Sequence, residues 1–169
     1  MGAISRLEVV PYPGGVPVPD SLAGHGQVFI NNLPGAAPHS GTEAFSPELQ
    51  QLIGTTMPLV DDLSQHHHIQ HRPVQLFYAN PAESLIHNTQ KLLKLLQWLQ
   101  GSDHILVPFS TNHSLIFHTL RQVVPCARGM QLEDVSLFYI GAAANRNPLQ
   151  AISSSCDMAF YFLHNPDLD

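Results

Sequence analysis

The chain has 169 residues, of which 44% are hydrophobic and only 12% are charged, and its formal net charge is -6 with the histidines neutral. This length fits one domain with a core of its own. The few Lys and Arg residues form no basic stripe, which argues against nucleic-acid binding. No apolar run approaches the ~20 residues of a membrane-spanning helix. So sparsely charged a surface fits a domain covered in Ser, Thr, Asn and Gln, or a subunit that hides part of its surface against a protein partner or another copy of itself.

Residues 1–43 are rich in proline and glycine, and we expect a wrapping arm or an irregular edge hairpin there, with a disordered tail as the alternative. Residues 4–10 and 27–30 are the strand candidates within it. Residues 44–169 then form an α/β core domain. The N-terminus lacks the basic start and apolar core of a secretory signal, which favours a cytoplasmic location.

The letters Ser46-Pro47-Glu48 predict the start of a helix, because they supply a capping oxygen, a proline that loses no hydrogen bond and a carboxylate in the first turn. Gly54 and Pro58 interrupt the apolar face that follows. We therefore expect a kinked helix, or two short helices that meet near residues 55–56.

A histidine cluster follows at residues 66–71. If the helix continues, His67 and His71 share one face at a spacing that suits a transition metal such as zinc. No third ligand follows at a fixed spacing, so a surface cluster without a metal is the other interpretation. Protonating all eleven histidines would change the net charge from -6 to 7 + 11 - 13 = +5, which also allows a pH sensor.

Three strand-then-helix units then repeat at a spacing of about 30 residues. Strands are expected at residues 74–78, 104–107 and 135–140, helices at 80–99, 112–124 and 148–154, and a last strand within 157–164. This alternation predicts a single α/β domain with a mainly parallel sheet of four or five strands and helices on its faces. The continuous apolarity of the last strand predicts burial on both of its faces.

The loops that follow parallel strands meet at one edge of a sheet, where α/β proteins bind their ligands. Small polar side chains and helix starts there suit a polar or anionic ligand, with Arg146 as the fixed charge. Helix capping alone would demand the same residue types. Neither a dinucleotide fingerprint nor a phosphate-binding loop is present. The candidate ligand-binding residues are Asn80, Ser110, Thr111, Asn112, His113, Gly141, Asn145, Arg146 and Asn147.

No local signature marks Cys126, Cys156 or any serine as a nucleophile. Our first hypothesis is therefore a non-enzymatic binding or assembly subunit that acts through protein–protein contacts. The alternatives are a small α/β enzyme that binds a polar or anionic ligand at the strand ends, and a histidine-based pH or metal sensor. A zinc-like ion at His67 and His71 is the one metal that the sequence suggests.

Overall fold

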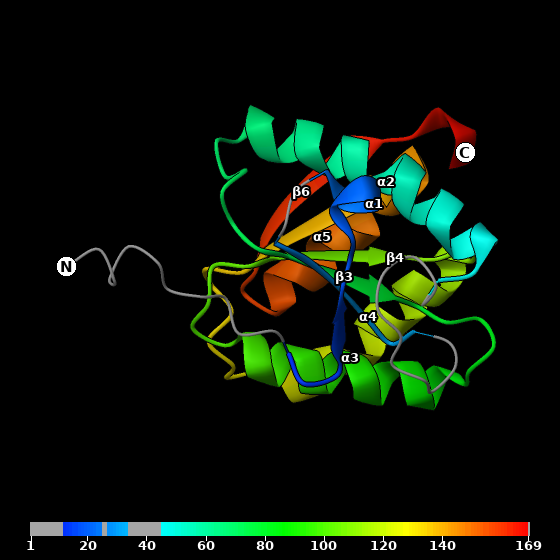
Figure 1. The fold of residues 1–169 in the computed structure, drawn as a ribbon. Coiled ribbons are helices and arrows are strands. Elements are labelled where there is room, and N and C mark those ends of the chain that lie inside the picture. Colours follow the sequence, from blue (N-terminus) through cyan, green and yellow to red (C-terminus); the bar gives the residue numbers. More distant parts are fainter. Residues whose placement is uncertain (1–11, 25–26, 34–44, 169) are drawn as a thin grey trace.

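A computed structural model describes residues 12–24, 27–33 and 45–168, and its centre is one six-stranded sheet (Figure 1). The strands lie in the sheet in the order in which they occur in the chain, and all neighbours are parallel except the first pair. They are β1 (Gly15–Pro17), β2 (Val28–Asn31), β3 (Val74–Tyr78), β4 (Ile105–Phe109), β5 (Ser136–Gly141) and β6 (Ala159–His164).

The predicted α/β fold with a mainly parallel sheet is thus confirmed. The sheet has six strands rather than four or five because the expected arm contributes both β1 and β2, which pair with each other as an antiparallel hairpin. The other strand expected in the arm, at residues 4–10, lies outside the described residues.

Helices cover both faces of the sheet. On one face lie α1 (Asp20–Ala23) and α2 (Pro47–His66), and on the other lie α3 (Leu85–Leu99), α4 (His113–Ala127) and α5 (Arg146–Ser155) (Figure 1). Two short 3-10 helices, η3 (Ala143–Asn145) and η4 (Pro166–Leu168), follow β5 and β6. No helix in the described part of the chain is both long and apolar enough to cross a membrane.

Side-chain caps fix where the long helices begin. Ser46, Ser84 and Asn112 each accept a hydrogen bond from the backbone N–H three residues later. The predicted helix start at Asn80 is wrong, because the Asn80 side chain accepts instead from the N–H of Ala82 and closes a turn. The helix therefore begins one turn later than its sequence suggests.

The path of α2 shapes the candidate site. Its residues form one uninterrupted helix that includes both Gly54 and Pro58, not two short helices. Although α2 connects β2 to β3, it also contacts β5 and β6. Each crossover between parallel strands moves one strand along the sheet in the same direction. Because α2 lies on the opposite face from α3, α4 and α5, its crossover has the opposite hand to the later three. It brings α2 close to the carboxyl ends of the later strands.

Two apolar clusters, one on each face, hold the layers together. On the α2 face, Ile53, Met57 and Val60 are fully buried at helical spacing against the sheet. On the other face, Leu92, Leu96 and their neighbours in α3 and α4 do the same. Burying one such side chain stabilises the fold by about 1.5–3 kcal/mol, so this double-sided core accounts for most of the stability.

Candidate functional site

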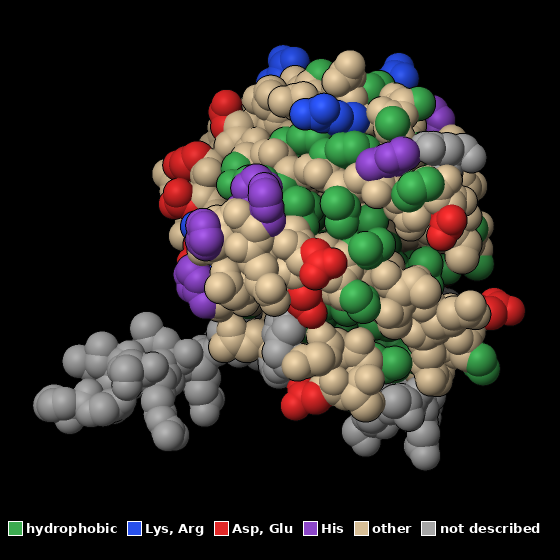
Figure 2. All heavy atoms as spheres, turned by 90° about the horizontal axis from the view of Figure 1, so that it is seen from above, with side chains coloured by type: hydrophobic (Ala, Val, Ile, Leu, Met, Phe, Trp, Pro, Cys, Tyr) green, Lys and Arg blue, Asp and Glu red, His purple; other side chains and the backbone are tan. Residues whose placement is uncertain are grey.

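A hollow of about 390 Å³ opens between α2, the carboxyl ends of β4 and β5, and the C-terminal η4 turn. Its volume falls in the range that small-molecule sites occupy, and aliphatic side chains mix with hydroxyl, amide and imidazole groups on its walls. Figure 2 looks onto the α2 side of the molecule, where hydrophobic side chains gather in a band with acidic side chains beside it. The lining residues are Leu52, Thr55, Thr56, Leu59, Val107, Pro108, Phe109, Ser110, Thr111, His113, Ile140, Asn165, Asp167 and Leu168.

Three of the nine candidate ligand-binding residues line this hollow, namely Ser110, Thr111 and His113. Asn145 and Gly141 lie behind it, because both contact Tyr139, which in turn holds His113. The other four, Asn80, Asn112, Arg146 and Asn147, are not among the lining residues. Asn112 caps α4, as helix capping alone would predict.

His113 is held by Tyr139 in one tautomer. The Tyr139 hydroxyl oxygen accepts hydrogen bonds from the Asn145 side-chain amide, at 3.0 Å, and from the backbone N–H of Ala142. With its oxygen occupied by two donors, the hydroxyl has its own hydrogen to give, and His113 Nδ1 lies 2.8 Å away. Nδ1 therefore accepts, and the ring proton resides on Nε2.

Burial keeps this cluster uncharged. It lowers the pKa of His113, and it raises the pKa of Tyr139 against the opposing effect of the Asn145 and Ala142 hydrogen bonds. At neutral pH, His113 thus presents a neutral ring with Nε2–H as its remaining donor. Such a group binds an acceptor atom, and its Nε2 cannot take up a proton as a general base.

Gly141 allows this arrangement. The Tyr139 ring lies along the strand where a Cβ on residue 141 would be, and its hydroxyl reaches the polar cluster past that position. Any larger residue at 141 would displace the ring and its hydroxyl. Position 141 requires the absence of a side chain and does not require unusual backbone angles.

The nucleophile candidates are already engaged or lie elsewhere. Ser110 is buried, donates its hydroxyl hydrogen to the carbonyl of Ala79 at 2.6 Å and accepts from the N–H of Asn112. Thr55 donates to the carbonyl of Leu52 within its own helix. Cys156 is buried, and its burial raises the pKa of its thiol, which opposes thiolate formation. Ser110, Thr55 and Cys156 are therefore poorly placed to act as nucleophiles.

The charges around the hollow oppose an anionic ligand. Among the described residues, its lining includes Asp167 and no Lys or Arg. Arg146, the cation expected to supply a fixed charge, instead lies 5.8 Å above the ring of Phe162. The positive end of α4 lies at His113, where it favours the acceptor end of a dipolar ligand.

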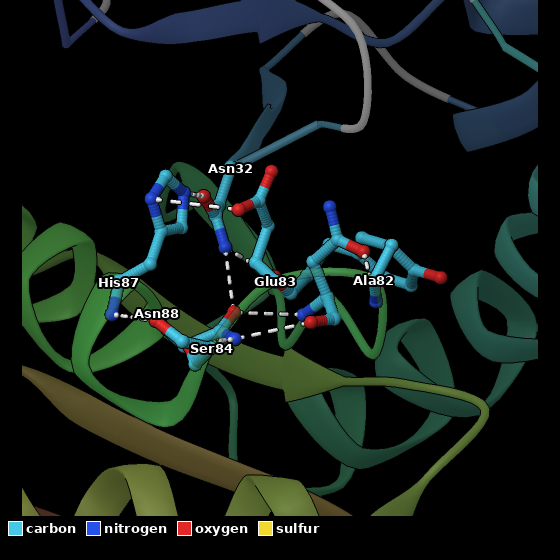
Figure 3. A network of polar contacts seen from close by, with 8 residues as sticks. Asn32, Ala82, Glu83, Ser84, His87 and Asn88 are labelled. Atoms are coloured by element: carbon cyan, nitrogen blue, oxygen red, sulfur yellow. Dashed lines mark hydrogen bonds and ion pairs between the residues drawn. The ribbon is translucent and has the colours of Figure 1, made fainter.

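A second polar cluster, at the end of β3, contains Asn80, which bonds to Asn88. Figure 3 shows Asn88 beside Asn32, Ser84 and His87. The centre of the cluster is Asn88, which is fully buried and donates to the carbonyls of Asn80 and Ser84. Its oxygen accepts from the N–H of Asn80 and from the side chain of Asn32. All four hydrogen-bonding positions of the Asn88 amide are used, so the cluster fastens the loop after β3 to β2 and leaves Asn88 no capacity for a ligand.

The helix that would place His67 and His71 on one face does not continue through them. α2 ends at His66, and His68 has a φ of 60°, so His67 and His71 do not share a helix face. The His67 ring packs 4.3 Å from the ring of Tyr161, and desolvation, followed by His66 and His68, lowers its pKa. Within the described residues, no group of three or more His, Cys, Asp or Glu side chains could hold a metal ion.

Sequence reasoning missed several parts of the hollow. Tyr139 stands within an apolar strand, where its hydroxyl carries no visible signal. Thr55 and Thr56 are polar residues in a helix whose position over the strand ends depends on the hand of the crossover. Asp167 follows the last strand, and the rule that strand ends gather ligands would have included it.

No family model matches the chain, and no curated protein or solved structure matches it either. The geometry of the hollow and of its polar groups is therefore the basis for a functional assignment.

Proposed function

We propose that this protein is a small-molecule-binding domain that holds its ligand in the hollow between α2 and the carboxyl ends of β4 and β5. The ligand is largely apolar, carries a carbonyl or similar acceptor oxygen, and has no net negative charge. The Nε2–H of His113 donates to that oxygen.

The observation that carries the proposal is the 2.8 Å contact between His113 Nδ1 and the Tyr139 hydroxyl, from which the tautomer of the ring follows. Three hydrogen bonds at the Tyr139 hydroxyl orient the ring before any ligand arrives, so little ordering cost remains for binding. Around it, Leu52, Leu59 and Ile140 supply the apolar contact area that a small ligand needs.

The sign of the ligand charge follows from the residues nearest to the hollow. An anion would be repelled by Asp167, and no Lys or Arg lines the hollow in the described part of the chain to compensate for that repulsion. A neutral or cationic molecule would meet no such penalty. The proposal therefore keeps the expectation of a ligand at the strand ends, replaces the polar ligand with a largely apolar one that carries an acceptor oxygen, and drops the anionic alternative.

Fragment binding followed by two-dimensional NMR on the full chain tests this proposal. A library of neutral, cationic and anionic fragments is titrated into the wild type, His113→Phe and the matched control His118→Phe. His118 is an exposed residue of the same helix, so its replacement makes the same chemical change away from the hollow.

We expect neutral or cationic fragments with an acceptor oxygen to shift the resonances of residues that line the hollow. His113→Phe should lower the affinity for these fragments about tenfold, which is the equivalent of one hydrogen bond of about 1.4 kcal/mol. His118→Phe should leave the affinity unchanged. Equal affinity in the two variants, or a preference for anionic fragments, would overturn the proposal.

A further inference from the structure

β6 is the edge of the sheet, and nothing in its sequence protects that edge. Within the described residues it pairs only with β5. Its residues 159–163 are half-buried, so the expectation of burial on both faces is wrong. The strand contains Ala159-Phe160-Tyr161-Phe162-Leu163-His164, without a proline, Lys, Asp or Glu. Natural edges are normally short, charged or interrupted by proline, as the three-residue β1 with Pro17 is at the opposite edge.

The backbone of β6 shows which residues face outward. The N–H of Ala159 bonds to the carbonyl of Val135 in the turn before β5, and the N–H of Asn165 bonds to the carbonyl of Gly141 at the end of β5. In a parallel ladder, alternate residues direct both their N–H and C=O to the same neighbour, so the odd-numbered residues face β5. Phe160 and Phe162 therefore direct their backbone donors and acceptors away from the sheet.

The side chains of β6 are already arranged as aromatic surfaces on both faces. On the α5 face, the Phe162 ring stacks 6.1 Å from the ring of Tyr139 and lies under Arg146. On the α2 face, the Tyr161 ring lies 5.4 Å from Phe138 and 4.3 Å from His67. These contacts hold the strand in an extended, ordered shape that another strand can match.

We propose that two copies of this chain form a dimer by antiparallel pairing of their β6 strands. Phe160 of each copy lies opposite Phe162 of the other, and the two-fold axis passes beside Tyr161. In this register the outward-facing residues of both strands form hydrogen-bonded pairs, and each pair exchanges two N–H···O bonds. Tyr161 then faces its own equivalent, where antiparallel strands approach most closely.

A second copy fits this edge for two reasons. An antiparallel strand pair is self-complementary, so one edge supplies both halves of a two-fold interface. No Asp, Glu, Lys or Arg side chain lies within either strand, so bringing two identical strands together places no like charges opposite each other. Aromatic pairs across the strands add to the backbone bonds. The proposal is independent of the ligand in the hollow.

The mass in solution and the exchange of individual amides test the interface together. Light scattering over a concentration series should give a mass approaching twice the 18.6 kDa of the monomer. Amide hydrogen exchange should slow at Phe160 and Phe162 as the dimer forms, while Tyr161 and Leu163, whose N–H groups point to β5, should be protected at every concentration.

Phe160→Pro and Phe160→Ala form a matched pair, since both remove the ring and only proline removes the outward N–H. We expect the proline variant to remain folded by circular dichroism. Its dimer dissociation constant should be at least 30-fold higher than that of the alanine variant, because each copy loses one hydrogen-bond donor. A wild type of monomer mass at every concentration would overturn the proposal. A dimer with fast exchange at Phe160 and Phe162 would also overturn it.

Discussion

Replacing Tyr139 by Phe removes one oxygen that joins three groups behind the hollow. The oxygen accepts from the Asn145 amide and the Ala142 N–H and gives its hydrogen to His113. Tyr139 itself is 1% exposed, so water cannot replace the lost atom at its position. Each net hydrogen bond is worth about 1 kcal/mol, and the three partners are half-buried and can recover part of it from solvent.

We therefore expect Tyr139→Phe to lower the free energy of unfolding by about 2–3 kcal/mol. In a domain of this size that loss corresponds to a fall in Tm of about 5–10 °C. Urea and thermal unfolding measure it, with Tyr78→Phe as the control, because Tyr78 is half-buried on the other face of the sheet. The control should stay within about 0.5 kcal/mol of the wild type. Equal small losses in both variants would refute the hydrogen-bond assignment at Tyr139.

Gly141→Ala should destabilise the fold by about 2 kcal/mol or more, because the new Cβ would collide with the Tyr139 ring. Gly54→Ala lies in open space within α2 and should stabilise the fold by about 0.5–1 kcal/mol in the same unfolding assay. Burial lowers the pKa values of His104 and His113, so the unfolded chain takes up protons first as pH falls through about 6.5. Stability should therefore be greatest above that pH and decline toward the lowered pKa values, and replacing both histidines with Gln should make the decline shallower in urea titrations between pH 7.5 and 5. Asn88→Asp should cost about 3 kcal/mol or more at pH 7, since a buried carboxylate would face two carbonyl oxygens, and the loss should shrink at pH 4, where the acid is neutral.

Local rules predicted the parts of this fold that depend on neighbouring residues. The caps at Ser46 and Asn112 could be predicted because each supplies a side-chain oxygen just before a segment with apolar residues at helical spacing. At Asn80 and Ser84, two acceptable caps compete within one turn, and the tertiary bonds from Asn88 decide in favour of the second. Residue propensities alone therefore cannot predict which of the two residues caps the helix.

The site could be predicted only in part, because its walls come from distant segments. Parallel topology alone brings Ser110 and His113 to the strand ends. The contribution of α2 depends on the unusual hand of its crossover, which the letters of the helix do not specify. Likewise, the apolar sequence of β6 is compatible with a central strand and with an unprotected edge, and only strand order distinguishes the two.

The most direct test of the account is the nitrogen NMR spectrum of the His113 imidazole, recorded before and after saturation with the best-binding fragment. We expect a neutral ring protonated at Nε2 in the unbound protein, with the Nε2 proton shifting strongly on binding while Nδ1 keeps its bond from Tyr139. A ring protonated at Nδ1, or a fragment that binds without changing the His113 resonances, would contradict the assignment of this hollow as the binding site.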